Sequence, residues 1–330
     1  MGDLMVSICC MAYNAEKYIA QCLDGFLMQK CDFAYEVFVH DDASTDGTVA
    51  VIKDYEKRYP EIIHAIYQTE NQYSKGVKIT DKYIYPYTKG KYIALCEGDD
   101  FWTDPLKLQK QVEALEKNHD CHICVHKVKG VYEDLSPFER NYPNFSITTG
   151  IIPAKRFIDY NCTNEYIFQT SSYFMRRDDV LEFITENPEF RKASATGDLA
   201  HMFYFATKGD IYYIDDEMSC YRQNSTSSKA RRSMNGTTER KIQEHFNKQI
   251  SMMLEYDKYT NGIYHNLCER KINGYLFDKA VRNRDFREVV KIKYRFFLRK
   301  YDIKTQIKTY CYAAFPKIME KYDKYKSDSV

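Results

Sequence analysis

Continuous apolar runs alternate with amphipathic segments along this chain, and this alternation constrains the fold more than any other feature. Four runs are apolar enough for parallel strands that are covered on both faces: MVSICCMAY (5–13), YEVFVH (35–40), IIHAIY (62–67) and KYIALC (91–96). Between and after them, apolar side chains recur at helical spacing in residues 14–29, 46–59 and 104–118, and a helical stretch is also expected near residues 79–88. The pattern predicts an α/β fold with a mainly parallel sheet flanked by helices.

The second half of the chain is less regular. CHICVHKV (121–128) indicates another strand, residues 166–184 a strand followed by a helix beginning near Asp178, and residues 196–210 a helix. Residues 211–224 favour two short strands. The polar and basic stretch 224–238 is typical of a loop and predicts a domain boundary near residue 230. We therefore expect a catalytic domain over 1–230 and a helical, basic C-terminal region over 231–330.

Charge and cysteine content exclude several classes of protein. The formal net charge is +1, whereas nucleic-acid binders usually carry a clear basic excess, so no nucleic-acid partner is expected. The 11 Cys have no repeating spacing and no secretory leader precedes them, which favours free thiols in a reducing cytoplasm. No apolar run approaches the roughly 20 residues that a membrane-spanning helix needs.

Acidic side chains follow two of the expected strands at the point where each ends. Asp41 and Asp42 follow one strand, and Asp99 and Asp100 follow another. In an open α/β sheet, ligands bind beyond the carboxyl ends of the strands, so these acids are placed where a ligand would lie. Asp99 and Asp100 suit a hard divalent cation that takes its remaining ligands from a diphosphate and water. Alternatively, they favour the start of the helix that follows them.

Two further acidic motifs each have a structural and a functional interpretation. In DDASTDGT (41–48), Ser44, Asp46 and Thr48 supply turn and helix-cap chemistry, whereas an acid at the strand end can accept the N3–H of a uracil ring. In TGDLAH (196–201), Asp198 begins a helix. It is either a helix cap or a general base that takes a proton from an attacking hydroxyl.

A short Cys and His cluster raises the alternative of a zinc site. HDCHICVH (119–126) places Cys121 and Cys124 at a short spacing, but no second pair of ligands is evident at a matching separation. The two thiols would also point to opposite faces of a strand. Buried strand packing is therefore the favoured interpretation.

Together these motifs closely resemble glycosyltransferase family 2, whose members are inverting enzymes with the Rossmann-like GT-A fold, especially the bacterial members that build surface polysaccharides. The resemblance covers residues 4–225 through VSICCMAYNAEKYIAQCLDGFLMQ, EVFVHDDASTDGT, GKYIALCEGDDFWTDPLKLQKQVEAL, TSSYFMRRD and TGDLAHMFYFATKGDIYYIDDEMSCYR. It implies roles for individual residues: Met11 and Tyr13 at the uracil and ribose, Asp42 reading the base, Asp99 at the donor's ribose or sugar, Asp100 as metal ligand with Asp99 beside it, Trp102, Ser171 and Ser172 lining the sugar and acceptor cleft, and Asp198 as catalytic base.

One position departs from the family pattern. Many relatives have His where this chain reads YRQN, so that Asn224 stands in its place. An amide is a poorer metal ligand than imidazole. Either Asp100, diphosphate and water hold the cation, or Arg222 carries more of the diphosphate charge.

The resemblance implies transfer of a sugar from a nucleotide donor, most often a UDP-sugar, to a saccharide or lipid-linked acceptor with Mn²⁺ or Mg²⁺. The alternatives are a metal-dependent nucleotidyl or phosphoryl transfer enzyme, and a non-catalytic glycan-binding scaffold on the same fold. From Arg287 to Val330 the chain has 12 Lys and Arg against 5 Asp and Glu. This basic tail favours peripheral contact with the inner face of the plasma membrane, or else a helical cap or homo-oligomer interface.

Overall fold

A computed structural model describes residues 2–163, 168–223, 239–319 and 321. The chain forms two compact units: residues 1–188 with 197–237, and residues 189–196 with 238–330. The whole of the expected boundary loop, 224–238, lies outside the described residues, and so does Asn224 within it.

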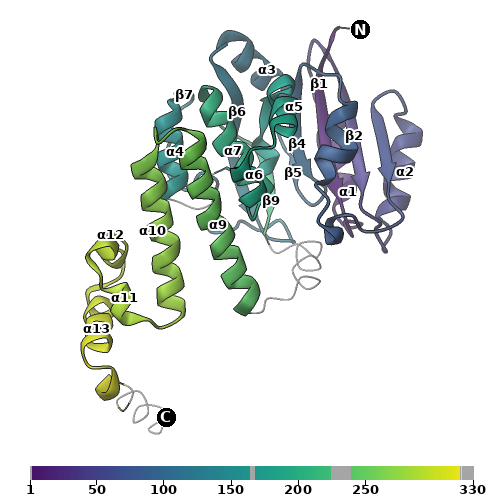
Figure 1. Ribbon diagram of the computed structural model, residues 1–330. Coiled ribbons are helices and arrows are strands. Elements are labelled where there is room, and N and C mark those ends of the chain that lie inside the picture. Colours follow the sequence, from purple (N-terminus) through teal and green to yellow (C-terminus); the bar gives the residue numbers. More distant parts are fainter. Residues whose placement is uncertain (1, 164–167, 224–238, 320, 322–330) are drawn as a thin grey trace. The chain divides into compact units, whose positions relative to one another are not determined.

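The described part of the first unit is built on a nine-stranded sheet (Figure 1). Its order is β3 (Ile63–Tyr67), β2 (Ala34–Asp41), β1 (Leu4–Ala12), β4 (Tyr92–Glu97), β8 (Phe174–Arg176), β6 (Cys121–Val131), β9 (Asp210–Arg222) and β5 (Phe101–Trp102), with β7 (Gly150–Ile152) paired to β9. The first four strands are parallel, as predicted. Because β8 runs antiparallel to both β4 and β6, the whole sheet is mixed.

Helices cover the sheet where the sequence predicted them. They are α1 (Ile19–Leu27), α2 (Thr48–Arg58), α3 (Lys107–Lys117), α5 (Arg177–Glu186) and α7 (Gly197–Lys208), with α4 (Ala154–Thr163) in a stretch where no element was predicted. The central strand β1 is buried on both faces, since Ile8 and Cys10 on one face are 0% exposed and Ser7 and Cys9 on the other are 0% and 2% exposed. Apolar residues at i, i+3 and i+4 of α1, such as Ile19, Cys22 and Leu23, complete that core.

Two predictions about local structure were wrong. Residues 211–222 form one strand rather than two, because the register of β9 against β6 shifts between Ile214 and Glu217 and lets pairing continue past two exposed acids. The helix expected near residues 79–88 is only a π-turn over Thr80–Ile84 followed by a 3₁₀ turn over Tyr85–Tyr87. Pro86 lacks the backbone N–H that a regular helix would need there.

The second unit is helical throughout its described residues. It contains α6 (Glu189–Ala193), α9 (Glu239–Tyr259), α10 (His265–Arg282), α11 (Phe286–Val289), η5 (Ile292–Tyr294), α12 (Arg295–Leu298) and α13 (Ile303–Ala314). Phe190 of α6 packs edge-on against Tyr256 and Tyr259 of α9. A small core of Phe277, Val289, Tyr294 and Leu298 joins the later helices. Among the described helices, none is long and apolar enough to cross a membrane.

Candidate active site

Main-chain hydrogen bonds join the carboxyl ends of three neighbouring strands. The Gly98 N–H donates to the Met11 carbonyl at 2.8 Å, and the Asp42 N–H donates to the Ala12 carbonyl at 3.0 Å. The loop after β1 is therefore held between the segment after β2 and the segment after β4. The structure thus brings the expected Met11, Asp42 and Asp99 segments to one edge of the sheet.

Side chains of the DDASTDGT motif tie the loops after β1 and β2 together. Ser44 Oγ accepts the Asn14 N–H at 2.9 Å, and Thr48 Oγ1 accepts the Ala15 N–H at 2.8 Å. Asp46 Oδ1 accepts the Thr48 N–H at 3.0 Å at the start of α2. The predicted turn role of these side chains is confirmed, whereas the predicted helix cap is not formed, because the N-cap of α2 is Gly47 and has no side-chain hydrogen bond. Ser44 and Thr48 instead hold the loop that contains the half-buried Tyr13.

The two acids after β2 have different partners. Both carboxylate oxygens of Asp42 accept backbone N–H groups, from Gln72 at 2.8 Å and from Tyr73 at 3.0 Å. Asp41 Oδ2 accepts the Ser44 N–H at 3.0 Å, whereas its buried Oδ1 has no hydrogen-bond partner among the described residues. Asp42 therefore anchors the 3₁₀ turn over Tyr73–Lys75, and Asp41 keeps an unused acceptor oxygen.

Asp99 and Asp100 lie in a tight turn after β4, where they are 4% and 3% exposed. The Asp100 N–H donates to the Glu97 carbonyl, and Asp100 Oδ1 accepts the Arg222 N–H at 2.9 Å. Burial, followed by the charges of Asp99 and Glu97, raises the pKa of the Asp100 carboxyl well above its usual value. The Arg222 N–H and charge offset only part of that rise.

Arg222, at the end of β9, holds the Asp99–Asp100 turn in place. Its Nη1 donates to the Asp99 carbonyl at 2.5 Å, and its Nη2 donates to Gln21 Oε1. The guanidinium lies 4.9 Å from the ring centre of Tyr18 and 4.6 Å from that of Phe101. The expected contact between Arg222 and a donor diphosphate would require the guanidinium to leave these partners or to share them.

The carboxylates of Asp99 and Asp100 in this turn are suitable ligands for a divalent cation. Two buried, mutually repelling carboxylates hold excess negative charge, which a bound cation would offset. Within the described residues, no three His, Cys, Asp or Glu side chains are grouped as a metal site. A cation held by Asp100 and Asp99 would therefore take most of its ligands from the donor and from water.

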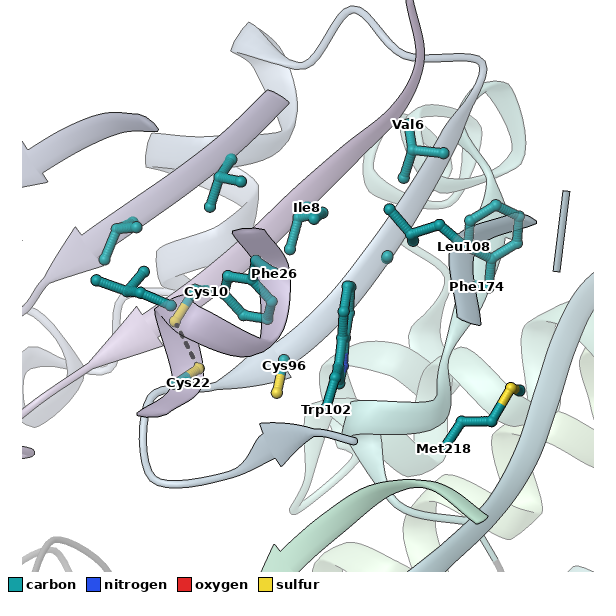
Figure 2. Packing of buried hydrophobic residues seen from close by; sticks show 14 of the residues in the cluster. Val6, Ile8, Cys10, Cys22, Phe26, Cys96, Trp102, Leu108, Phe174 and Met218 are labelled. Atoms are coloured by element: carbon teal, nitrogen blue, oxygen red, sulfur yellow. Dashed lines mark hydrogen bonds between the residues drawn. The ribbon is translucent and has the colours of Figure 1, made fainter. Parts of the chain in front are cut away.

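Trp102, expected in the sugar cleft, lies in the hydrophobic core instead (Figure 2). It is 2% exposed, its ring packs edge-on against Phe26 at 4.7 Å, and the Lys107 ammonium lies 3.8 Å from its ring centre. A Cβ on Gly25 would come within 3.0 Å of the Trp102 backbone, so α1 approaches this strand closely. This position gives Trp102 a packing role beneath the acidic turn, and contact with a sugar would require its neighbours to move.

Ser171 and Ser172 also point into the protein. Both are 0% exposed; Ser171 Oγ lies 2.9 Å from Ser219 Oγ of β9, and Ser172 Oγ donates to the Gln169 carbonyl at 2.7 Å. These bonds attach the 3₁₀ turn Thr170–Ser172 to the sheet. The two hydroxyls are engaged in the fold, and their expected role in the acceptor cleft has no geometric support.

Asp198 lies in the first turn of α7 and is partly exposed. Its Oδ1 accepts the N–H of the next residue, Leu199, at 2.8 Å. The helix packs against β6 and β9, the strand that ends at Arg222. The carboxylate is thus accessible at a helix N-terminus, which suits both the capping and the general-base interpretation.

Several residues that shape the site escaped sequence reasoning. Gln21 and Tyr18 orient Arg222, but one polar residue and one Tyr in an amphipathic helix give no distinguishing signal. Lys107 and Gln111 could have been found, because they lie four apart beside the apolar stripe of α3.

In the HDCHICVH segment, Cys121 and Cys124 are buried in β6, and His122 pairs with Asp179 at 2.7 Å.

The buried Lys107 predicts an unusual pH dependence of stability. Burial lowers the pKa of its ammonium to about 7, whereas an unfolded Lys titrates near about 10.4. Between these values the unfolded chain binds more protons, so stability should rise with pH by up to about 1.4 kcal/mol per unit relative to Lys107→Met. Urea unfolding of both proteins from about pH 6.5 to 9 measures this difference.

The matched control is Lys117→Met, which removes a 72% exposed Lys from the same helix. Its free energy of unfolding should follow the wild-type pH profile. Parallel profiles for wild type and Lys107→Met would show that Lys107 remains protonated in the folded protein.

Comparison with known proteins adds sequence and fold relationships to this geometry. Residues 7–185 match the sequence profile described as glycosyl transferase family 2. An uncharacterized protein of Mycobacterium tuberculosis is 34% identical over 224 residues, which are 67% of this chain and 59% of that protein. The Bacillus subtilis protein named putative teichuronic acid biosynthesis glycosyltransferase TuaG is 35% identical over 109 residues, 33% of this chain and 41% of that protein.

Among solved structures, S. aureus TarS 1-349 in complex with UDP-GlcNAc shares the fold. Its TM-score is 0.61 at 16% identity, and the match covers 94% of this chain and 87% of that one. The sequence matches to the Mycobacterium and Bacillus proteins span 59% and 41% of those proteins' own lengths.

Proposed function

The chain belongs to glycosyltransferase family 2, and from this premise we propose that it is an inverting glycosyltransferase. Its donor is a nucleotide sugar, with a UDP-sugar favoured, and its acceptor is a saccharide or a lipid-linked saccharide. The GT-A fold predicted from the sequence is the fold shared with TarS, whose structure contains UDP-GlcNAc. The name of TuaG supports a place in the synthesis of a bacterial surface polysaccharide.

One observation carries this proposal most directly: the hydrogen-bonded junction of the three strand ends. Through Gly98, Met11 and Asp42 it holds the segment of Asp42, the carboxylate that would read the base, at the same sheet edge as the segment of Asp99 and Asp100, the carboxylates that would bind a cation. A nucleotide diphosphate needs both kinds of group within its own length. A nucleotidyl or phosphoryl transfer enzyme could use the same edge and the same general base, so the match to glycosyl transferase family 2 is what favours glycosyl transfer over that alternative.

In the proposed mechanism, each residue performs one physical task. Asp42, or the unused oxygen of Asp41, accepts the N3–H of the uracil ring. Arg222 keeps the Asp99–Asp100 turn in position through the Asp99 carbonyl. Asp198 accepts the proton of the acceptor hydroxyl as that oxygen attacks the anomeric carbon from the side opposite the leaving diphosphate. Attack in line with departure inverts the anomeric configuration.

The divalent cation belongs to the proposal as well. Asp100 would hold it, with Asp99 beside it, and Asn224 replaces the His that many relatives have. A bound Mn²⁺ or Mg²⁺ supplies Lewis-acid stabilisation of the charge on the departing diphosphate. A bound cation would offset the repulsion between Asp99 and Asp100, and the diphosphate would supply further ligands to that cation. The affinity for the cation should therefore depend on bound diphosphate, and the affinity for diphosphate on bound cation.

Titration calorimetry with UDP, with and without Mn²⁺, tests the donor site, and slow hydrolysis of a panel of nucleotide sugars tests the chemistry. We expect UDP to bind at least about tenfold more tightly with Mn²⁺, since a paired buried charge contributes more than about 1.4 kcal/mol. If the affinity for UDP is the same with and without Mn²⁺ and no nucleotide sugar is hydrolysed, the result would favour a glycan-binding scaffold.

A further inference from the structure

The last helix of the second unit exposes its apolar side chains. In α13, Ile303 is 75% exposed, Ile307 is 59% exposed and Tyr310 is 47% exposed. These residues are spaced i, i+4 and i+7, so they form a stripe along one face of the helix, here named the α13 stripe. The buried position of this helix is instead a polar residue, Thr309, at 8% exposure.

The orientation of α13 is fixed by contacts on its opposite side. Tyr312 stacks on Phe286 of α11 with ring centres 4.6 Å apart (Figure 1 shows both helices). At the start of the helix, Asp302 caps the Thr305 N–H at 2.9 Å. The α13 stripe therefore faces away from the packing contacts, and no rotation of the helix could bury it without losing them.

Cations lie beside the apolar residues. Lys304 and Lys308 follow the two Ile residues directly in the sequence, so they line one side of the stripe; both are exposed. Neither of them forms an ion pair with the described part of the chain, and Lys308 contacts only the ring of Tyr312, at 5.4 Å. The preceding segment repeats the pattern, with Ile292 91% and Phe296 52% exposed among Lys293, Arg295 and Arg299.

Charge decides between the partners that could cover this surface. Residues 287–330 carry a net +7 through 12 Lys and Arg against 5 Asp and Glu, whereas the whole chain carries +1. A second copy presenting the same surface would place like charges opposite one another. A surface of phospholipid with anionic headgroups offers both an apolar layer for the Ile side chains and negative charge for the Lys side chains.

We propose that the α13 stripe, with Lys304 and Lys308 beside it, docks the protein onto the surface of an anionic phospholipid bilayer. The helix has 12 residues, too few to span a bilayer, so it lies in the plane of the interface. The inference concerns the second unit alone and does not depend on the reaction proposed for the first.

Co-sedimentation of the full chain with vesicles tests the inference. We expect binding to phosphatidylcholine vesicles that contain about one third phosphatidylglycerol, and little binding to pure phosphatidylcholine. Ile303→Ser with Ile307→Ser should weaken binding at least about tenfold, because the apolar anchors are lost. Lys304→Gln with Lys308→Gln should weaken it roughly twentyfold at low salt, at about fivefold for each charge.

Two matched controls keep the result specific. Ile263→Ser replaces a 74% exposed Ile elsewhere in the same unit, and Lys248→Gln replaces an exposed Lys on α9. Both should bind vesicles as the wild type does. Vesicle binding that is unchanged in both paired variants, or an α13 stripe that instead holds two copies of the chain together in sedimentation without vesicles, would overturn the proposal. Unchanged UDP binding in the paired variants confirms that the first unit is intact.

Discussion

Asp198→Asn should lower sugar transfer by about a hundredfold to ten-thousandfold, the range expected for the loss of a general base. The amide has nearly the same shape but cannot take the proton of the acceptor hydroxyl. Its oxygen can still accept the Leu199 N–H that Asp198 accepts in the wild type, so the start of α7 should be retained. Initial rates at saturating donor and acceptor measure the loss as a change in kcat.

The control must separate proton transfer from the favourable interaction of an acid with a helix N-terminus. Asp178 is suitable because it lies in the first turn of α5 and is 98% exposed. Asp178→Asn should change stability by at most about 1 kcal/mol and leave kcat unchanged. UDP affinity measured by calorimetry should be the same in Asp198→Asn and in the wild type. A parallel loss of UDP affinity in Asp198→Asn would place this residue at the donor rather than at the acceptor.

The parallel half of the fold could be predicted because buried strands leave a simple signal. A strand covered on both faces, such as β1, is apolar at nearly every position, and the helix that covers it is apolar at every third or fourth position. The short antiparallel strands β5 and β7 have two and three residues, too few to show any period, and β8, where a strand was predicted ahead of the helix near Asp178, has three residues. In β9 the exposed acids Asp215 and Asp216 interrupt the apolar pattern while the backbone pairing continues through a bulge.

The acidic edge of the site could be predicted for a related reason. Strand ends are visible in a sequence, and parallel strands end at the same edge, so the proximity of the Asp42 and Asp99 segments follows from topology. The direction in which a single side chain points does not follow from topology. Trp102 follows two acids in the sequence, yet β5 pairs with β9 and turns the indole into the core against Phe26. The resemblance assigned Trp102 to the sugar cleft, and neither it nor the neighbouring acids indicate the direction in which the indole points.

Asp100→Asn should abolish the effect of Mn²⁺ on UDP binding and lower transfer by about a hundredfold or more, because Lewis-acid stabilisation supplies several kcal/mol. The substitution removes one of two carboxylates that would hold the cation and leaves the acceptor side of the site unchanged. Its amide oxygen can still accept the Arg222 N–H, so the turn after β4 should keep its shape. Calorimetry with and without Mn²⁺, together with transfer rates, measures both effects.

The same variant should be more stable than the wild type in buffer that contains no divalent cation. The pKa of Asp100 is raised in the folded protein, so the folded state holds its proton to higher pH than the unfolded chain does. Stability from this group is therefore lost as pH rises from the usual Asp range through the raised pKa, so above that range an Asp at this position is destabilising relative to its contribution at low pH. An Asn at this position carries no such penalty. Thermal unfolding in the presence of a chelator measures the expected gain.

Asp104→Asn is a control in the same segment, and we expect it to change the free energy of unfolding in the opposite direction from Asp100→Asn. Asp104 accepts the Leu106 N–H at 2.8 Å and pairs with Lys110 at 2.7 Å, so its replacement should reduce stability and leave the response to Mn²⁺ unchanged. Saturating UDP and Mn²⁺ should raise the stability of the wild type by about 2.7 kcal/mol at a hundredfold excess over Kd, and that of Asp100→Asn far less. If Asp100→Asn is more stable than the wild type without ligand but is stabilised less by UDP and Mn²⁺, the repulsion at Asp100 lowers the stability of the free protein and serves cation binding. If Asp100→Asn instead loses stability without ligand, the carboxylate is a structural anchor for the Arg222 N–H.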